Sequence, residues 1–168
     1  MADETFSSRN AMLALGDSYT IGEGVASDQR WPNQLISRLR GESKCPKRAE
    51  VLATTGWTTD ELLEATENYT FSPPYALVSL LIGVNNQYRG RCLENYSAEF
   101  SRLLDLAVAQ SGGKVGQVMI VSIPDWGVTP FAIEKGVDPH SVAAEIDGFN
   151  ECARELATQR GAHWIDIT

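Results

Sequence analysis

The chain has 168 residues, of which 43% are hydrophobic and 21% are charged, and its formal net charge is −8. This length and composition are typical of one globular domain and unlike those of a disordered chain. The negative charge disfavours binding to nucleic acid or to an anionic membrane surface, because an acidic surface repels phosphate groups.

Short apolar runs alternate with amphipathic stretches along the chain. The apolar runs predict five strands, over Ala11–Leu15, Glu50–Ala53, Tyr75–Ile82, Val118–Ile123 and His163–Ile167. Apolar residues at helical spacing predict helices over residues 31–39, from the capping box of Thr58 and Glu61, over residues 96–107, and from Ser141 to Gly161. The segment between the fourth strand and Ser141 is expected to be a loop.

Strands separated by helix-length segments predict one parallel sheet with helices on both faces. We therefore expect a single α/β domain over residues 1–168, with a flavodoxin-like three-layer α/β/α architecture and a five-stranded parallel sheet. In open sheets of this type the ligand lies beyond the carboxyl ends of the strands. Four segments that follow strands should meet at that edge, namely residues 16–18, 55–56, 83–86 and 124–126.

These strand ends carry the groups that acyl transfer requires. Ser18 follows the first strand in a tight turn, which presents a hydroxyl for nucleophilic attack. Gly56 allows close approach to a backbone N–H, and Asn85 offers a neutral NH₂ donor. Donors of this kind stabilise the oxyanion that develops during attack on an ester carbonyl.

Three sequence blocks resemble those of the SGNH, or GDSL, hydrolase family. GDSYTIGEG, over residues 16–24, resembles the first block, Gly56 occupies the place of the glycine in the second, and LLIGVNNQ, over residues 80–87, resembles the third. The resemblance extends along the whole chain and implies the SGNH hydrolase fold. It implies Ser18 as nucleophile and an oxyanion hole made by the Ser18 N–H, the Gly56 N–H and the Asn85 side chain.

The last block of the family is an Asp-x-x-His motif after the fifth strand, which supplies the general base and the Asp that orients it. The sequence ends at Asp166-Ile167-Thr168, where that segment would begin. We therefore expect a C-terminally truncated domain whose final helix is missing. Apolar side chains of central strands such as Leu77–Leu81 should then be exposed, so that the chain self-associates through the uncovered face, is marginally stable, or continues past Thr168.

Two histidines are candidates for a substitute base. His140 lies at the correct edge of the sheet, near Asp138, and is taken as the candidate base, with a solvated loop histidine as the alternative. His163 begins a strand at the opposite edge and is interpreted as structural. Reach to Ser18 decides between such candidates.

The expected substrate pocket contains Asp17, Asn86, Tyr88 and Trp126. Asp17 is also expected to bond backbone groups and hold the turn. Asn86 occupies a position that is often Asp in the family. Tyr88 and Trp126 either line an acyl or sugar pocket or belong to the core. Neither a cofactor nor a metal site is predicted, and the three cysteines lack the spacing of a zinc site.

The sequence thus predicts an esterase, a serine hydrolase acting on a small ester. The alternative is a catalytically impaired remnant that retains only a small-molecule pocket. A nucleotide-binding domain is disfavoured because neither Gly-x-Gly-x-x-Gly after the first strand nor a P-loop occurs. No secretory leader or membrane-spanning run is evident, so a cytoplasmic location is expected.

Overall fold

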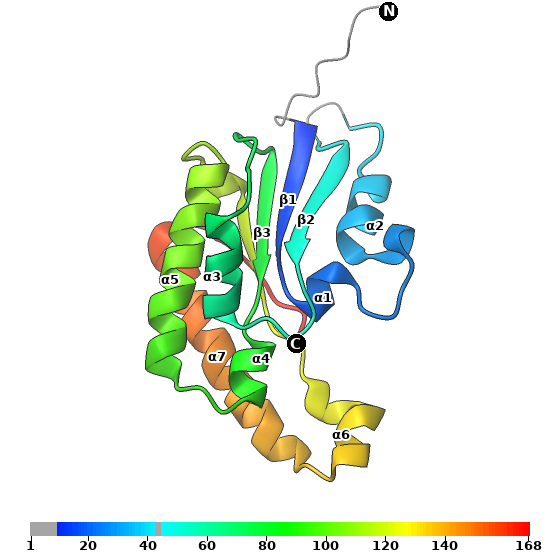
Figure 1. The fold of residues 1–168 in the computed structure, drawn as a ribbon, viewed down its shortest axis with the longest axis vertical. Coiled ribbons are helices and arrows are strands. Elements are labelled where there is room, and N and C mark those ends of the chain that lie inside the picture. Colours follow the sequence, from blue (N-terminus) through cyan, green and yellow to red (C-terminus); the bar gives the residue numbers. More distant parts are fainter. Residues whose placement is uncertain (1–9, 43–44) are drawn as a thin grey trace, which may run out of the picture.

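The computed structural model describes residues 10–42 and 45–168. Five parallel strands form one sheet in the order β2-β1-β3-β4-β5 (Figure 1). The strands are β1 Ala11–Gly16, β2 Arg48–Ala53, β3 Leu77–Leu81, β4 Val118–Val121 and β5 His163–Ile165. This sheet confirms the predicted flavodoxin-like α/β architecture.

The α-helices are α1 Ser18–Ile21, α2 Trp31–Arg38, α3 Thr59–Glu67, α4 Val84–Tyr88, α5 Leu93–Gln110, α6 Pro130–Lys135 and α7 Pro139–Arg160. The described residues also include the 3₁₀ turns η2 Ser27–Gln29, η3 Val115–Gln117 and η4 Trp126–Val128. The capping box of Thr58 and Glu61 starts α3, as the sequence predicts.

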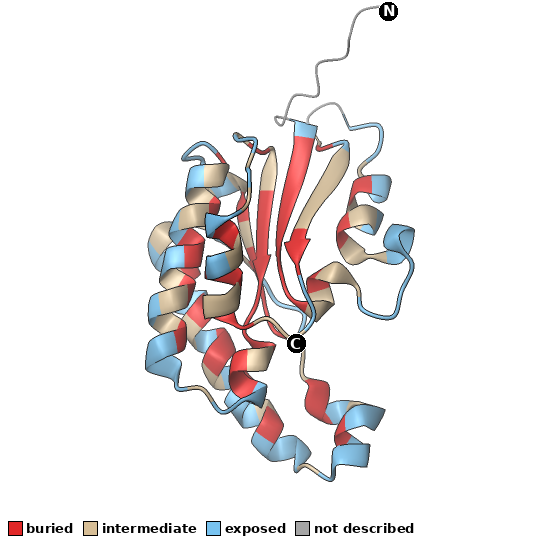
Figure 2. Ribbon diagram, viewed as in Figure 1, coloured by how far each residue is buried: buried red, intermediate tan, exposed pale blue. Residues whose placement is uncertain are grey.

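Helices cover the two faces of the sheet unequally. On one face, α3, α5 and α7 enclose the main core (Figures 1 and 2). On the other face α2 packs against β1 and β2, and Ile36 joins Met12 and Ala14 in a smaller core cluster. One helix thus covers one face and three helices cover the other. This arrangement is expected when strands are added on both sides of β1.

The second face is less open than predicted. Leu81 is only 2% exposed, and Leu77 and Met119 are half-buried because they pack with Trp31 and Leu35 around the smaller core cluster. The expectation that Leu77–Leu81 is exposed is therefore wrong for most of β3. The exposed apolar groups lie farther out, at and beyond β5, where Ile165 is 42% and Ile167 50% exposed. Self-association through this edge stays a prediction.

The segment after β4 differs most from the sequence prediction. It forms η4 and α6 instead of a loop, and α7 begins at Pro139 with Asp138 as its N-cap, one turn before Ser141. Thr129 caps α6 by accepting a hydrogen bond from the Ala132 N–H. In Figure 1, α6 and the start of α7 extend beyond the carboxyl ends of the strands.

Candidate active site

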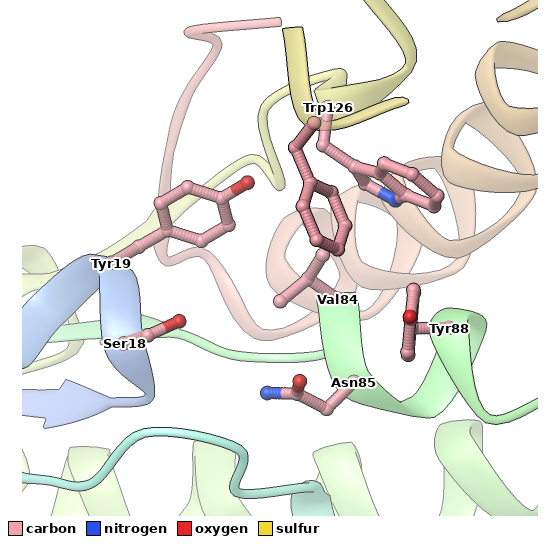
Figure 3. Close-up of a pocket in the computed structure, with 7 residues that line it drawn as sticks. Ser18, Tyr19, Val84, Asn85, Tyr88 and Trp126 are labelled. Atoms are coloured by element: carbon pink, nitrogen blue, oxygen red, sulfur yellow. The ribbon is translucent and has the colours of Figure 1, made fainter. Parts of the chain in front are cut away.

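Ser18 begins α1 directly after β1. Asp17 precedes it as the N-cap, and the Asp17 carboxylate accepts a hydrogen bond of 3.0 Å from the Tyr19 N–H. The Ser18 carbonyl accepts from the Gly22 N–H at 3.0 Å, which ends the helix after one turn. This turn leaves the partly exposed Ser18 hydroxyl pointing into a pocket (Figure 3).

Asp17 itself is fully buried under the turn. Burial raises the pKa of its carboxyl to about 7, against hydrogen bonds from backbone groups that lower it. Its Oδ2 has no hydrogen-bond partner among the described residues. Burial also raises the pKa of the neighbouring Tyr19 phenol, with smaller contributions from the charges of Asp17 and Asp125. Tyr19 is therefore a neutral hydroxyl at the pocket wall.

Asn85 lies on α4, across the pocket from Ser18 (Figure 3). Its side-chain Nδ2 donates to the Trp57 carbonyl at 2.9 Å. Because a carbonyl can only accept, this bond fixes which end of the amide is the NH₂ group. The second hydrogen of that group stays free to point elsewhere. Gly83 places Asn85 at this position, because its φ of 131° turns the chain from β3 into α4.

Gly56 lies in the loop between β2 and α3, next to Trp57. Its φ of 86° places it in the left-handed region, which other residues seldom adopt. Among the described residues, neither the Gly56 N–H nor the Ser18 N–H donates a hydrogen bond to a protein acceptor. Two backbone donors and one side-chain donor thus come from the carboxyl ends of β2, β1 and β3.

The rest of the pocket wall is aromatic. A cavity of about 240 Å³ is lined by Ser18, Tyr19, Val84, Asn85, Tyr88, Trp126 and Phe131. The Trp126 ring centroid lies 5.5 Å from that of Tyr88 and 5.8 Å from that of Phe131. None of the seven lining side chains carries a formal charge at neutral pH. The arrangement suits a small, neutral, largely apolar molecule.

Trp126 is held in this wall by a chain of hydrogen bonds. Its indole Nε1–H donates to Gln87 Oε1 at 2.8 Å, and Gln87 Nε2 donates to Glu145 Oε2 at 2.7 Å. Trp126 and Gln87 are both 7% exposed. The indole therefore has a defined orientation in the pocket wall.

Comparisons with known proteins identify the family and the shared fold. The model of the GDSL-like lipase/acylhydrolase family matches residues 14–168. This chain belongs to that family. Membership of this family makes the protein a GDSL-type hydrolase, as the sequence blocks predict. The fold is shared with a solved SGNH-hydrolase family esterase.

Three solved structures illustrate the shared fold of this GDSL-like hydrolase. TesA has a TM-score of 0.71 and is 20% identical, over 92% of this chain and 76% of its own. AlinE4, an SGNH-hydrolase family esterase, has a TM-score of 0.68 at 19% identity, over 98% of this chain and 77% of its own. The psychrotrophic esterase EstA from Pseudoalteromonas sp., solved inhibited by monoethylphosphonate, has a TM-score of 0.65 at 17% identity, over 94% and 77%. No curated protein has a sequence that matches the chain.

Three of the residues that the sequence placed in the site of the GDSL-like hydrolase lie elsewhere. Asp17 and Asn86 are both fully buried, so neither can line a substrate pocket. Asn86 instead holds the start of α3, where its Oδ1 accepts from the Thr59 N–H at 3.1 Å. His140 is an exposed residue in the first turn of α7, outside the pocket lining, and its N–H bonds Asp138 Oδ1 at 3.2 Å. His163 starts β5 at the opposite edge.

Phe131 and Arg89 are the residues that sequence reasoning missed. Phe131 reaches the pocket only because residues 130–135 form α6, which the Thr129-Pro130 pair, a cap followed by a helix-starting proline, could have indicated. Arg89 follows α4 and bonds the carbonyl of Gly56 at 2.6 Å. A side chain that acts on a distant backbone carbonyl leaves no pattern in the sequence.

Residues 10–42 and 45–168 contain neither a candidate metal site nor a candidate membrane-spanning helix. No group of three or more His, Cys, Asp and Glu side chains there is arranged to hold a metal ion. No helix in the described ranges combines the length and the apolar character that crossing a bilayer requires.

Proposed function

We propose that this GDSL-like hydrolase is an esterase whose nucleophile is Ser18 and whose substrate is a small, uncharged ester with an apolar group. The observation that carries the proposal is the convergence of the Ser18 hydroxyl and the Asn85 amide on one aromatic-walled cavity. The Ser18 N–H and the Gly56 N–H lie at the two neighbouring strand ends. Together these groups have the composition of a nucleophile with its oxyanion hole.

In the proposed reaction, Ser18 Oγ forms a bond to the ester carbonyl carbon while the carbonyl π electrons move onto its oxygen. The Ser18 N–H, the Gly56 N–H and the Asn85 Nδ2 donate to that oxyanion. Collapse of the intermediate breaks the bond to the alkoxide, which takes a proton from solvent water and leaves as the alcohol. Water then attacks the acyl-serine, releases the carboxylic acid and restores Ser18.

The proton of Ser18 needs an acceptor, and the pocket lining contains no histidine. In the sequence given, we propose that hydroxide from solvent takes this proton. Oxyanion stabilisation and binding alone still supply a roughly 10³–10⁴-fold rate gain over water when a triad member is lost. The rate should therefore be low and should rise with pH.

The size and character of the cavity support the proposed substrate class. At about 30 Å³ for each water-sized group, 240 Å³ holds roughly eight heavy atoms. Tyr88, Trp126 and Phe131 offer flat apolar surfaces, and no charged side chain lines the cavity to pair with a charged substrate. An acyl group such as butanoyl or hexanoyl fits this description better than a polyhydroxylated sugar.

Hydrolysis of p-nitrophenyl butyrate tests the proposal. The parent chain should exceed the buffer rate, and Ser18→Ala should return the rate to that of buffer with an unchanged circular dichroism spectrum. Asp28→Ala, an exposed substitution outside the pocket, serves as the control and should keep the parent rate. Equal rates for the parent and Ser18→Ala, both above buffer, would refute Ser18 as nucleophile.

A further inference from the structure

Side chains from α4 and its C-terminal end hold the loop between β2 and α3 at three points. Asn85 Nδ2 donates to the Trp57 carbonyl at 2.9 Å, and Arg89 Nη2 donates to the Gly56 carbonyl at 2.6 Å. Asn86 Oδ1 accepts from the Thr59 N–H at 3.1 Å. Asn85 and Arg89 are four residues apart, so both project from the same side of the helix. Two successive carbonyls of the loop are therefore held from one surface.

The Arg89 guanidinium also reaches the start of α3. Its Nη1 lies 3.2 Å from Glu61 Oε1, while Glu61 Oε2 accepts from the Thr58 N–H at 2.9 Å. The planar guanidinium thus bridges the Gly56 carbonyl and a side chain that is already fixed to the backbone two residues farther on. A bridge of this kind uses the fork geometry that distinguishes arginine from lysine.

Gly56 is the residue whose orientation depends on this bridge. With a φ of 86° and no side chain, its backbone has several accessible conformations, and the direction of its N–H changes among them. Apart from its two chain neighbours, a Cβ added at Gly56 would meet only the Arg89 Nη2 within 4 Å, at 3.6 Å. Arg89 thus lies against the glycine whose orientation must be fixed.

We propose that Arg89 is a positioning residue that fixes Gly56 so that its N–H points at the oxyanion. The inference rests on the proposed function, in which that N–H is one of three donors. Arg89 acts through the Gly56 carbonyl and does not touch the substrate. Its loss should slow formation of the tetrahedral adduct and leave ground-state binding nearly unchanged, because the oxyanion exists only after attack.

Arg91 provides a matched control. Its Nη1 pairs with Asp60 Oδ1 at 2.6 Å, so it links the same part of the chain to the first turn of α3 without contacting Gly56 or Trp57. Arg89→Ala and Arg91→Ala each remove one positive charge and one ion pair with α3. Ion pairs as exposed as these contribute little to stability, so both variants should fold.

Two measurements test the proposal together. The first is the rate at which ethyl p-nitrophenyl methylphosphonate releases p-nitrophenolate in single-turnover reaction with each variant. Arg89→Ala should react about tenfold more slowly at saturating reagent, less than the roughly 10²–10³-fold expected for loss of a whole donor. Arg91→Ala should stay within twofold of the parent, and Arg89→Lys, which keeps one donor, should fall between.

The second measurement is the order parameter of the Gly56 amide, obtained from nuclear magnetic resonance relaxation, because this N–H has no protein acceptor among the described residues and its mobility must be measured directly. The order parameter should fall in Arg89→Ala and stay at the parent value in Arg91→Ala. The proposal is wrong if the Gly56 order parameter is unchanged in Arg89→Ala, or if both alanine variants lose the same reactivity. Absence of any Ser18-dependent reaction in the parent would instead remove the proposed function, and the role of Arg89 with it. If the parent reacts as expected and Arg89→Ala reacts equally fast, the proposed role of Arg89 is wrong and the proposed function stands.

Discussion

The two sides of the candidate active site are built differently. On the oxyanion side, the loop of Gly56 and Trp57 is held by hydrogen bonds from α4, and Asn86 secures the start of α3. On the opposite side, the segment of η4 and α6 presents Phe131, which is 48% exposed, and Ile133, which is 77% exposed. The first side is fixed by polar contacts to its neighbours, while the second, apart from the hydrogen-bonded Trp126, extends apolar side chains into solvent.

This difference matches the two tasks that the proposed reaction sets. Stabilising an oxyanion requires donors whose directions are fixed before the reaction, because reorganising them would cost free energy at the transition state. Holding an apolar group requires surface and shape but few precise directions. Changes on the oxyanion side should therefore alter the rate for every ester, and changes on the aromatic side should alter the preference among esters.

The largest effect in free energy is expected beneath the oxyanion side, at Asp17. Its pKa of about 7 in the folded state exceeds the ordinary value of 3.8, so between these two pH values the folded state binds more protons than the unfolded state. Stability is then lost as pH rises from about 4 to 7, by on the order of 4 kcal/mol for three pKa units. Asp17→Asn should remove this loss.

The measurement is the free energy of unfolding of Asp17→Asn, of Asp60→Asn and of the parent from pH 2 to 8. The difference between Asp17→Asn and the parent should grow up to about pH 7 and then level off. Asp60→Asn is a control of opposite sign, because Arg91 and Thr58 lower the pKa of Asp60 to about 2 against the effect of burial. Relative to Asp60→Asn, the parent should gain stability as pH rises from about 2 to 4, and the difference should stay constant above that. A pH-independent difference for Asp17→Asn would show that Asp17 is already ionised at pH 4.

Asn85→Ala should have the largest effect on rate. Loss of one oxyanion donor costs about 2.7–4 kcal/mol in the barrier, and the loss should appear in kcat more than in KM. Asn85 also holds the Trp57 carbonyl, so the order parameter of the Gly56 amide should fall in this variant. Steady-state kinetics with p-nitrophenyl acetate and p-nitrophenyl hexanoate should show the same proportional loss for both esters. A change in KM alone would assign Asn85 to ground-state binding.

Phe131→Ala should have a smaller and selective effect. Each methylene that a substrate buries contributes about 0.8 kcal/mol, and Phe131 is one of four aromatic side chains in the pocket lining. We expect kcat/KM to fall by about three- to tenfold for the hexanoate ester and to stay nearly constant for the acetate ester. Ile133→Ala, on the same helix but outside the pocket lining, should leave both values within twofold. An equal loss of kcat/KM for both esters in Phe131→Ala would contradict this, because it would mean that α6 affects the reaction step and not the preference among esters.

The sequence predicts the two sides unequally well, for a physical reason. The strand ends follow from apolar runs and glycine turns, so Ser18, Gly56 and Asn85 could be placed at one edge of the sheet before any coordinates. Burial of Asp17 and Asn86 could not be foreseen, because polar side chains are buried only where tertiary partners bind them. The hydrogen bond from Arg89 to the Gly56 carbonyl could not be foreseen either, because the two residues are 33 positions apart in the sequence.

The aromatic side was predicted in part. Tyr88 and Trp126 were expected near a pocket because they follow strand ends, and the structure places both in its lining. Phe131 was not expected near the pocket, because the proline and glycine residues within 124–140 predicted a loop. In the structure, Thr129 and Gly136 cap a short helix in this segment. Short helices fixed by their caps carry little periodicity, so hydrophobic spacing does not reveal them.

The most direct test of the central claim is covalent labelling of Ser18. The chain and its Ser18→Ala variant are incubated with ethyl p-nitrophenyl methylphosphonate at pH 8, and intact mass and peptide mapping are recorded over time. We predict one phosphonyl group per chain, on the peptide that contains Ser18, and none on the variant. Binding of hexanamide without labelling would indicate a protein that only retains the pocket. Labelling at another residue, or equal labelling of both proteins, would contradict the assignment of Ser18 as the nucleophile.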